Sequence, residues 1–342
     1  MQQPSLGRLN DILKRVSRSF YLTLRILPRP LRTPIGLAYL FARAADTIAD
    51  TALISPAARL TLLEQFRSLF QDYDAAILRV LRGAVGPQHI PAERALLSSL
   101  EECFAVFQAC PQGDQTRVRR LLLTLTQGMV MDLTTFPPEH DGRVVALKTR
   151  QDLDQYTYYV AGCVGEFWTD MHVAHRPSLA GWDVEVMKQW GVRFGKGLQM
   201  TNILRDLAHD LRLGRCYLPL EALTPYGLSP AHLLEPSAIA NARPILQDLL
   251  ALTMDHYRGG WSYTLAIPRR EIQMRLACAW PLLIGCRTLD LVARADNLLD
   301  PCVTVKVSRA AVYRMLTASS LLVLSNRGLR RYASHLGRQL MC

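Results

Sequence analysis

The sequence lacks the patterns that mark several common classes of protein. Its eight cysteines include no Cys-x-x-Cys pair and no zinc-ligand spacing, and most of them stand in apolar, helix-like text. This usage is typical of a reducing compartment and argues against a disulfide-stabilised framework. The chain also has no glycine-rich phosphate loop and no G-x-G-x-x-G motif after a strand, which disfavours nucleotide hydrolysis and a Rossmann cofactor site.

Targeting and membrane-spanning patterns are lacking as well. The segment MQQPSLGRLNDILKRVSRSF at the N-terminus holds no apolar signal-peptide core. No uninterrupted run of about 18 apolar residues exists. We therefore expect a cytoplasmic protein with no signal peptide and no transmembrane helix, while a peripheral contact with a membrane surface stays open.

Negative charge is in short supply. The chain has 40 Lys and Arg against 29 Asp and Glu, which gives a net charge of +11 at pH 7. This excess suggests an anionic partner, such as nucleic acid, acidic lipid or a phosphorylated small molecule. The basic residues are scattered, with a modest concentration in SNRGLRRYASHLGRQ near the C-terminus. Because neither a Lys/Arg-rich arm nor a zinc-finger spacing is present, we expect no nucleic acid partner.

Strand-like alternation is scarce, and helical periodicity dominates the chain. The segment SPAARLTLLEQFRSLFQDYDAAILRVLRG begins with an N-cap serine, has Pro56 at the first helical position and ends at a glycine. No linker is long or polar enough to divide the chain. The pattern predicts an all-α fold, with roughly ten or more helices in a single domain over residues 1–342. Helices are expected at about 55–83, 90–110, 114–136, 149–177, 182–213, 236–264, 268–298 and 307–338.

Two aspartates interrupt an apolar run in FARAADTIAD, residues 41–50. Asp46 and Asp50 are four residues apart, so they fall on one face of a helix about one turn apart. Like charges at this spacing repel and destabilise an isolated helix by roughly a few tenths of a kcal/mol. The chain is 49% hydrophobic, so two carboxylates in this apolar run need an explanation.

A second stretch, GLQMTNILRDLAHDLRLGRCYLPLEAL, repeats the pattern at residues 197–223. Asp206 and Asp210 are again four apart, and Asn202 lies one turn upstream on the same stripe, with Gln199 close to that face. Two helices that each carry such a pair could face each other across a cavity. Arginines that could clamp phosphate charge stand close in the sequence: Arg43, Arg205, Arg212 and Arg215.

Four carboxylates in one place need compensating cations. Mg²⁺ is the natural candidate, because it prefers oxygen ligands and is commonly held by one or two carboxylates together with substrate phosphate oxygens. The alternative is a solvated helix face, which is the usual situation for a single Asp-xxx-Asp pair. Two pairs, both in apolar surroundings and both near arginines, favour a metal–diphosphate site beside an apolar cavity.

At these residues the sequence resembles the squalene/phytoene synthase family, which joins two prenyl diphosphates head to head. The resemblance covers about residues 15–315. It implies a single all-helical isoprenoid-synthase domain with a central apolar cavity and the activity of a Mg²⁺-dependent prenyltransferase. Four motifs carry it in order: SRSFYLTL (17–24), AYLFARAADTIADT (38–51), YTYYVAGCVGEF (156–167) and LQMTNILRDLAHDLRLGRCYLP (198–219).

Roles for individual residues follow from the motifs. Tyr159 matches the family's tyrosine near the reacting carbons, where a phenol ring stabilises a carbocation by roughly 0.5–2 kcal/mol and helps to relay a proton. Packing in the core is the alternative role for this tyrosine. The candidate metal ligands are Asp46, Asp50, Asn202, Asp206 and Asp210, and the four aspartates are also candidate catalytic residues. The candidate diphosphate-binding residues are Ser17, Arg18, Tyr39, Arg43, Gln199, Asn202, Arg205 and Arg215.

Small residues follow the tyrosine motif. Ala161, Gly162 and Gly165 lack bulk, so they would leave room for a prenyl chain beside their helix. Close packing between helices is the alternative explanation for small residues at this spacing.

Finer features resemble the squalene-forming members of the family. ADTIAD and YYVAGCVG are closer to those members than to the phytoene-forming ones. CAWPLLIGCRTLDLV (278–292), followed by VTVKVSRAAVYRM (303–315), resembles a section, here about 268–320, that is associated with NADPH. Lys306 and Arg309 match its basic positions. The membrane-anchoring C-terminal helix of eukaryotic relatives is expected to be missing.

The resemblance therefore implies a farnesyl-diphosphate farnesyltransferase. Two farnesyl diphosphates would condense to presqualene diphosphate, and NADPH would reduce this intermediate to squalene, with a peripheral membrane contact for product release. The alternatives are a phytoene, dehydrosqualene or hydroxysqualene synthase of the same family, which needs no hydride donor, and a non-catalytic helical scaffold. The sequence leaves open the prenyl chain length, NADPH against NADH, the oligomeric state and the role of Asp132.

Overall fold

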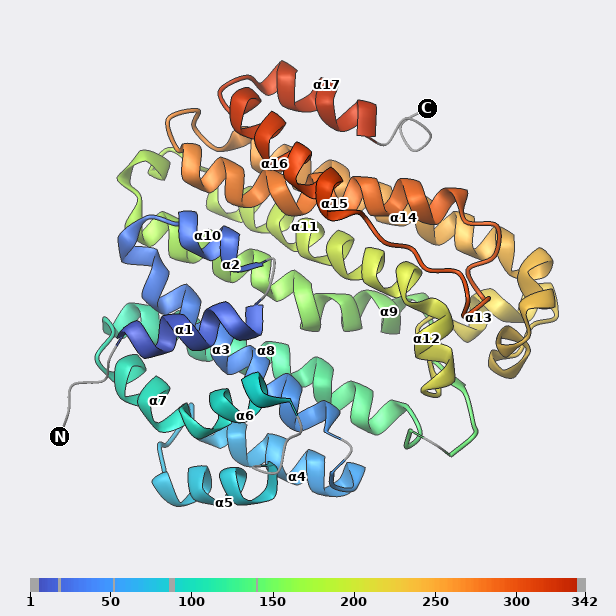
Figure 1. Ribbon diagram of the computed structural model, residues 1–342, viewed down its shortest axis with the longest axis horizontal. Coiled ribbons are helices and arrows are strands. Elements are labelled where there is room, and N and C mark those ends of the chain that lie inside the picture. The colour runs from blue at the N-terminus through green and yellow to red at the C-terminus, as the bar shows by residue number, and fades with distance from the viewer. Residues whose placement is uncertain (1–5, 18–19, 52, 86–89, 140, 337–342) are drawn as a thin grey trace. The chain divides into compact units, whose positions relative to one another are not determined.

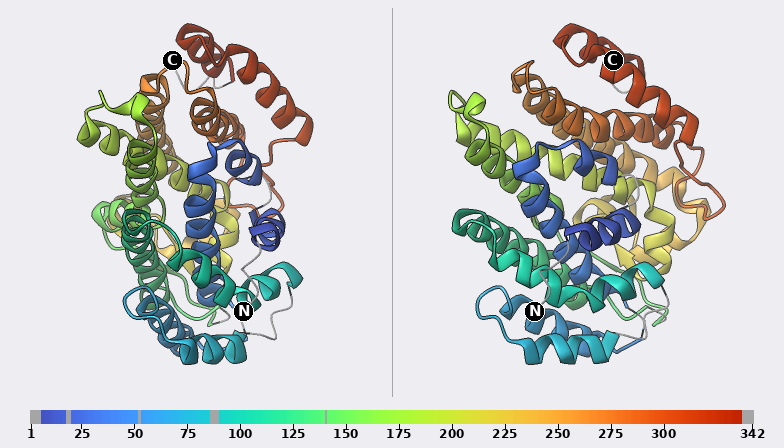
Figure 2. Two further views of the ribbon diagram at one scale, coloured as in Figure 1. Left: turned by 90° about the vertical axis from the view of Figure 1, so that its left-hand side faces the viewer. Right: turned by 60° about the vertical axis from the view of Figure 1, so that its left-hand side comes forward.

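The computed structural model describes residues 6–17, 20–51, 53–85, 90–139 and 141–336. Helices account for most of these residues (Figures 1 and 2), as the sequence predicts. Strand structure in the described ranges is limited to β1 (Val145–Ala146) and β2 (Arg215–Cys216), which pair in parallel, with Val145 opposite Arg215. The prediction of an all-α chain is confirmed.

The chain divides into two compact units, which are described separately. Unit 1 comprises residues 1–133 and 170–177, and unit 2 comprises residues 134–169 and 178–342. The expectation of a single domain stays a prediction.

The described residues of unit 1 form eight helices, α1 to α8, the last of which ends just beyond the unit's boundary. The bounds are α1 (Leu6–Ser17), α2 (Phe20–Ile26), α3 (Arg29–Asp50), α4 (Pro56–Ser68), α5 (Ala75–Val85), α6 (Pro91–Ser98), α7 (Leu100–Gln108) and α8 (Gln112–Thr135). The expected N-cap at Ser55 is confirmed, because its side chain accepts a hydrogen bond from the Ala58 N–H. The helix expected over 55–83 is two helices, α4 and α5, and the one expected over 90–110 is α6 and α7.

An aromatic cluster holds α3 in the core of unit 1. Phe41 is fully buried and its ring lies 4.7 Å from that of Phe104 and 5.1 Å from that of Phe70, measured between centroids. Edge-to-face and tilted aromatic pairs at these distances stabilise a core beyond their buried area. Because Phe41 is only two residues before Arg43, this packing fixes the end of α3 that carries the first aspartate pair.

Unit 2 contains β1, β2 and the remaining helices and turns. Its helices are α9 (Arg150–Thr157), the π-helical turn η1 (Tyr158–Gly162), α10 (Cys163–His175), α11 (Val184–Arg205), α12 (Leu207–Arg212), α13 (Leu220–Leu223), α14 (Ile239–Ala266), α15 (Ile272–Arg294), α16 (Arg309–Leu322) and α17 (Asn326–Leu336). Short 3₁₀ turns connect them: η2 (Pro177–Leu179), η3 (Thr224–Tyr226), η4 (Pro230–Leu234) and η5 (Pro236–Ala238). The last residues of α10 belong to unit 1.

The core of unit 2 lies where α11 packs on α14. Tyr257 is fully buried, and its hydroxyl lies 3.0 Å from the Thr201 hydroxyl. Tyr263 accepts a hydrogen bond of 3.1 Å from the Thr169 hydroxyl. Buried tyrosines are stable in a core when the phenol finds such a partner. The contact between Thr201 and Tyr257 fixes α11, the helix that leads to the second aspartate pair, on α14.

One described helix, α15, is long and apolar enough to cross a membrane by its length and composition. Of its apolar window, 61% is buried inside the fold, as in the core helix of a soluble protein. The sequence search for an unbroken apolar run did not detect this helix, because charged residues such as Arg287 and Asp290 interrupt it.

Candidate functional site

The first aspartate pair lies at the C-terminal end of α3, in unit 1. Arg43 donates from Nη1 to Asp46 Oδ2 at 2.5 Å and from Nη2 to Glu93 Oε1, on α6, also at 2.5 Å. Asp46 is half-buried, Glu93 is buried and Asp50 is exposed. The arginine is thus held by two carboxylates from two helices. Only one of these carboxylates, Asp46, was predicted from the sequence.

The electrostatics of Arg43 fit an anionic ligand. Burial lowers the pKa of its guanidinium, but the Asp46 and Glu93 carboxylates outweigh burial, so the pKa lies above its usual value and the group stays charged. Its Nε–H is buried and has no hydrogen-bond partner among the described residues. A buried donor without a partner is costly, and an acceptor from a ligand would remove that cost.

Two further candidates of unit 1, Ser17 on α1 and Tyr39 on α3, make hydrogen bonds to backbone carbonyls of α1. Tyr39 donates from its hydroxyl to the Val16 carbonyl at 3.4 Å, which ties α3 to α1. Ser17 is buried, and its hydroxyl donates to the Leu13 carbonyl of its own helix. The structure therefore gives both hydroxyls structural bonds near α3. Arg18 lies outside the described residues.

The second aspartate pair, in unit 2, lies where a helix changes direction. The helix expected over 182–213 is interrupted at Asp206, whose φ of −99° and ψ of 9° depart from helical values, so α11 ends and α12 begins there. Even so, the Asp206 N–H donates to the Asn202 carbonyl at 2.9 Å, and the Asp210 N–H to the Asp206 carbonyl at 3.0 Å. The bonds at four-residue spacing persist, so the predicted separation of about one turn survives the break.

An arginine accompanies this pair as well. Arg205 donates from Nε to Asp206 Oδ1 at 2.8 Å and from Nη2 to Oδ2, a bidentate pair. The hydrogen bonds that Arg205 donates to Asp206, together with the charges of Asp206 and Asp210, raise the pKa of Arg205 against the lowering effect of burial. Asp206 is therefore directly hydrogen-bonded to a cation, as Asp46 is.

The other polar candidates of unit 2 differ in their surroundings. Asn202 is exposed and donates from Nδ2 to Gln199 Oε1 at 3.4 Å. Arg215, on β2, is half-buried and donates to Glu139 Oε1 at 3.1 Å. Arg212 is exposed and donates to the Ala208 carbonyl of its own helix. The structure thus places Gln199 and Asn202 together and gives Arg215 a carboxylate partner of its own.

The tyrosine motif forms a π-helical turn, η1, between α9 and α10. Single π turns within helices are frequent at functional sites, because they re-aim side chains. Tyr159 is half-buried and accepts a 2.8 Å hydrogen bond from Gln155 Nε2. Tyr156 is buried and stacks on Tyr217 with ring centroids 4.8 Å apart, so it serves packing.

The small residues of this motif do not leave room for a substrate chain. A Cβ on Gly165 would lie 2.0 Å from the Gly191 carbonyl oxygen, and one on Gly195 would lie 2.1 Å from the Ala161 carbonyl oxygen. A Cβ on Gly162 would meet Val192 and Lys196 at 3.2 and 3.4 Å. The expectation of a gap beside this helix is wrong, because the backbone of α11 already occupies the space.

Sequence reasoning also missed a charged group around this turn. Lys196 is buried, pairs with Asp154 Oδ1 at 2.6 Å and lies 5.9 Å above the Tyr158 ring. The Tyr158 hydroxyl donates to Glu166 Oε2 at 3.0 Å. Acidic residues at positions 154 and 166 flank the motif in the sequence, but only the fold brings Lys196 between them.

The basic positions expected for NADPH lie in an extended segment and at the start of α16. Lys306 and Arg309 are both exposed. The Ser308 side chain caps α16 by accepting from the Ala311 N–H at 3.2 Å. The two cations are therefore exposed on either side of a helix cap, and their role toward NADPH stays a prediction.

The residues fit Mg²⁺ only with help from a ligand. Within the described ranges, no three His, Cys, Asp or Glu side chains form a metal-binding group by themselves. Mg²⁺ typically uses one or two carboxylates and completes its octahedron with phosphate oxygens and water. Each aspartate pair offers carboxylate oxygens of this kind. Because Asp46 and Asp206 belong to different units, their convergence stays a prediction.

Comparisons with known proteins bear on the family and the fold of this chain. The profile of the family described as squalene/phytoene synthase matches residues 13–311. The squalene synthase of Eremothecium gossypii is 27% identical over 301 residues, which cover 88% of this chain and 65% of that protein. A bifunctional lycopene cyclase/phytoene synthase of Pyrenophora tritici-repentis is 31% identical over 240 residues, which cover 70% of this chain and 38% of that protein. The chain thus spans about two thirds or less of these relatives.

Solved structures show the same fold. A structure of TcSQS with a ligand has a TM-score of 0.73 at 22% identity and covers 97% of both chains. A dehydrosqualene synthase in complex with a ligand has a TM-score of 0.62 at 25% identity and covers 91% of this chain and 93% of that one. The all-α isoprenoid-synthase fold expected from the sequence is therefore confirmed, while the central apolar cavity stays a prediction.

Proposed function

Because the chain belongs to the squalene/phytoene synthase family, we propose that it is a Mg²⁺-dependent farnesyl-diphosphate farnesyltransferase. In this proposal it condenses two farnesyl diphosphates head to head to presqualene diphosphate, with release of one diphosphate and one proton. A second ionisation releases diphosphate, and hydride from NADPH then gives squalene and NADP⁺.

One observation carries the proposal: each unit joins an arginine to the first aspartate of an Asp-xxx-Asp pair. Arg43 contacts Asp46 and Arg205 contacts Asp206. The carboxylate of such a pair can bind a metal through its oxygens, and the permanently charged arginine can bind phosphate oxygens. A solvated helix face would need neither, so the paired arrangement favours a diphosphate site over the solvated alternative.

The proposed division of labour follows from these contacts. When bound, Mg²⁺ would supply the positive charge that stabilises the departing diphosphate, the largest kind of electrostatic contribution to catalysis. Asp46, Asp50, Asp206 and Asp210, supported by Asn202, would hold it. Arg43 and Arg205 would bind the diphosphate oxygens, with Ser17, Arg18, Tyr39, Gln199 and Arg215 as further candidates.

Tyr159 would act on the carbon skeleton. Its hydroxyl accepts from Gln155, so the phenol proton is free to point elsewhere and to pass to or from a departing group. Its ring could stabilise a passing carbocation through its face. Lys306 and Arg309 would bind NADPH through its phosphates.

The proposal is tested by incubating purified protein with farnesyl diphosphate and Mg²⁺, with and without NADPH, and identifying the products. We expect squalene with NADPH and presqualene diphosphate without it. Lys306→Ala should raise the KM for NADPH and leave presqualene diphosphate formation unchanged.

A second candidate within the family is dehydrosqualene synthesis, which uses no hydride. The likeness to a dehydrosqualene synthase structure over 91% of the chain favours keeping it. Dehydrosqualene in the presence of NADPH, or phytoene from the C20 substrate, would replace the squalene proposal. No product from any prenyl diphosphate would favour a non-catalytic scaffold.

A further inference from the structure

The last part of the chain differs in charge from the rest. Residues 301–342 contain seven of the 40 Lys and Arg and none of the 29 Asp and Glu, so they carry seven of the eleven net positive charges. An unbroken positive segment of this length attracts an anionic partner. Only two of these residues, Lys306 and Arg309, are used by the proposed function.

Helices α16 and α17 form a hairpin on α15, and Figures 1 and 2 show them side by side there. Their inner sides are packed: Leu283, Met315 and Ala333 form a buried cluster, against which Trp261 and Tyr332 also pack. The hairpin is therefore an integral part of unit 2, and its outer side is a defined surface.

A buried arginine fixes the bend of the hairpin. Arg275 is fully buried and donates to the Val323 carbonyl at 2.8 Å, the Ile267 carbonyl at 2.6 Å and Asn326 Oδ1 at 2.6 Å. Asn326 in turn donates to the Leu265 carbonyl at 3.2 Å. Because these hydrogen bonds fix the bend, the side chains around it have defined positions.

Apolar side chains are exposed on the outer side of this bend. Leu321 is 82% exposed, Leu324 is 54% exposed and Tyr313 is 65% exposed. Tyr313 and Leu321 lie on α16, and Leu324 follows two residues after the end of this helix. A single exposed leucine is ordinary, but two beside a fixed bend, together with a tyrosine, form an apolar face that water solvates poorly.

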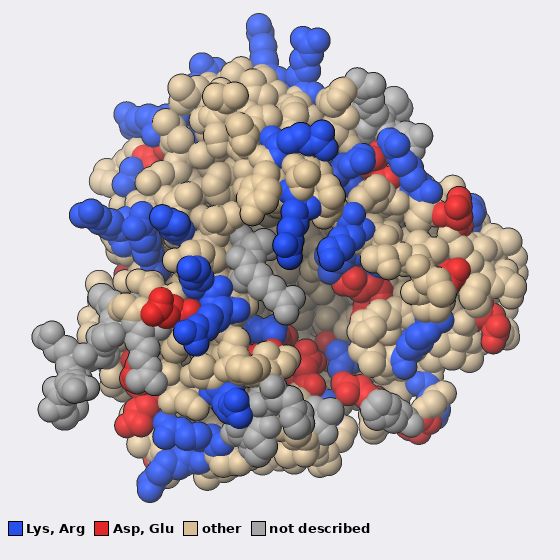
Figure 3. Space-filling view, in the orientation of Figure 1, with Lys and Arg blue, Asp and Glu red and all other residues tan. Residues whose placement is uncertain are grey.

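Arginines are exposed on the same hairpin. Arg314 lies on α16 within the exposed stripe, and Arg327, Arg330 and Arg331 occupy the exposed stripe of α17, opposite the buried Leu329. In Figure 3, blue side chains project from the top of the molecule, where α16 and α17 lie in Figure 1. Exposed apolar side chains together with exposed arginines on one hairpin are the pattern of a surface that inserts shallowly into a lipid interface.

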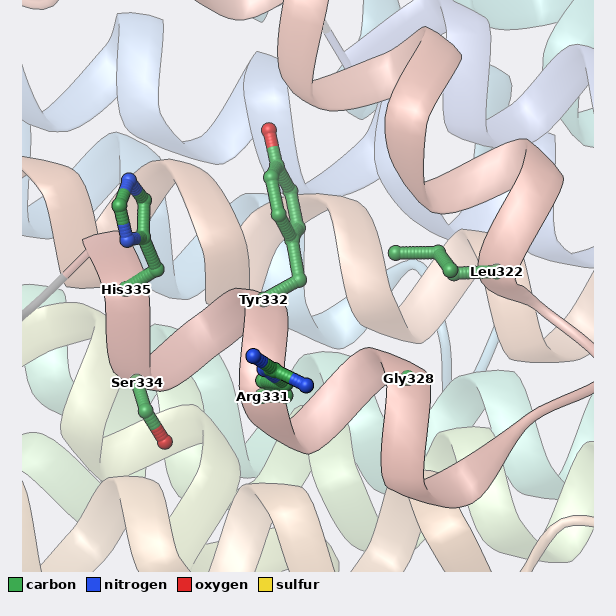
Figure 4. Close-up of a pocket in the computed structure, with 6 residues that line it drawn as sticks. All are labelled: Leu322, Gly328, Arg331, Tyr332, Ser334 and His335. Atoms are coloured by element: carbon green, nitrogen blue, oxygen red, sulfur yellow. The ribbon is translucent and has the colours of Figure 1, made fainter.

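A hollow beside the arginines could receive a lipid headgroup. It has a volume of about 530 Å³ and is lined by residues of both helices: Leu322, Gly328, Arg331, Tyr332, Ser334 and His335. In Figure 4, Tyr332 and His335 point to the same side, and the Leu322 side chain points toward the base of Tyr332. Cationic and hydroxyl donors next to a leucine match a phosphate group joined to an acyl chain.

We propose that the outer face of α16 and α17, formed by Tyr313, Arg314, Leu321, Leu324 and the arginines of α17, docks on an anionic phospholipid bilayer. Nucleic acid would match the arginines but not the exposed leucines. A second copy of the face would bring two positive surfaces together. An anionic bilayer is the partner that satisfies both the charge and the apolar side chains. The inference does not depend on the reaction catalysed.

Vesicle sedimentation with the full-length protein tests the proposal. We expect binding to vesicles that contain about one third phosphatidylglycerol, weak binding to pure phosphatidylcholine, and loss of binding in high salt, which screens surface charge. Arg327→Gln, Arg330→Gln and Arg331→Gln together should weaken binding by at least about tenfold. The matched control removes the same charge elsewhere, through Arg79→Gln, Arg82→Gln and Arg94→Gln, all exposed in unit 1, and should bind nearly normally.

The place of contact is tested with a fluorescent reporter. Tryptophan emission from a Leu321→Trp variant should shift to the blue on anionic vesicles, while Val80→Trp, at a position 52% exposed on α5, should not shift. Equal binding of both vesicle types, equal loss in the control variant, or a shift at position 80 would overturn the proposal. So would a dimer that forms through this face in place of vesicle binding. Because the readouts are binding and emission, an inactive enzyme would not affect them.

Discussion

The two aspartate pairs have the same spacing and the same kind of partner, yet the fold holds them differently. In unit 1, Arg43 is fixed by Asp46 from its own helix and by Glu93 from a helix fifty residues away. In unit 2, Arg205 pairs with the next residue, Asp206, at a break between helices. The first arrangement depends on tertiary structure and the second on local geometry. The same arginine–aspartate pairing is therefore stabilised by tertiary contacts in unit 1 and by local backbone geometry in unit 2.

Despite this structural difference, the first aspartates of the two pairs should be equally important for activity. Asp46→Ala and Asp206→Ala should each reduce presqualene diphosphate formation by about 10³-fold, because each removes a charged group that acts on the departing diphosphate. Both side chains are 39% exposed, so stability should change by no more than about 1 kcal/mol. Rates are measured with saturating Mg²⁺ and farnesyl diphosphate, and stability by urea unfolding. Normal turnover by either variant would remove that aspartate from the site.

Unit 2 should be the more sensitive to helix packing. Gly195→Ala places a Cβ 2.1 Å from the Ala161 carbonyl oxygen, so α11 must move away from η1. We expect a loss of about 1–3 kcal/mol of stability or more, together with lower turnover, because α11 carries Asn202 and leads to Asp206.

The matched control for this variant is Gly83→Ala in unit 1. Nothing lies within 4 Å of a Cβ at Gly83, and alanine is the better helix former, so stability should rise slightly, by about 0.5–1 kcal/mol. Equal behaviour of the two variants in urea unfolding would contradict the close backbone contact between α11 and η1.

Unit 1 should be the more sensitive to loss of a distant carboxylate. Glu93→Ala leaves Arg43 with one partner and opens a buried polar site, which should cost about 1–3 kcal/mol. Glu101→Ala is the control, because Glu101 is 67% exposed and lies 3.6 Å from Arg82, and such a surface pair contributes about 0–1 kcal/mol. If both variants unfold at the same urea concentration, Glu93 is not the support that the geometry indicates.

The sequence was sufficient to predict the features that depend on the spacing of residues along one helix. Apolar periodicity predicted the helical class, and the separation of Asp206 from Asp210 survived even where the helix broke. It was insufficient where distant segments meet. Nothing near position 93 marks Glu93 as the partner of Arg43, because only the packing of α6 near α3 brings them together. Gly165 showed the other limit, since a missing side chain is compatible with a substrate gap and with a close helix contact alike.

A smaller effect should distinguish unit 2 by its response to acid. Burial, assisted by the positive charges of Lys196 and Arg193, lowers the pKa of His256 from 6.5 to about 4. Its Nδ1 atom is buried without a hydrogen-bond partner among the described residues. His256 therefore becomes protonated below about pH 6.5 in the unfolded chain but only near pH 4 in the folded chain. The free energy of unfolding should therefore decrease as the pH falls through this range.

The size of this effect at pH 5 should be about 1–2 kcal/mol relative to pH 7. Urea unfolding of His256→Gln should show a smaller decrease between the two pH values, because glutamine does not titrate. His209→Gln, at an exposed position on α12, is the matched control and should follow the parent protein. If His256→Gln also follows the parent, the decrease arises from other groups, and α14 next to α11 contributes no acid-sensitive element to unit 2.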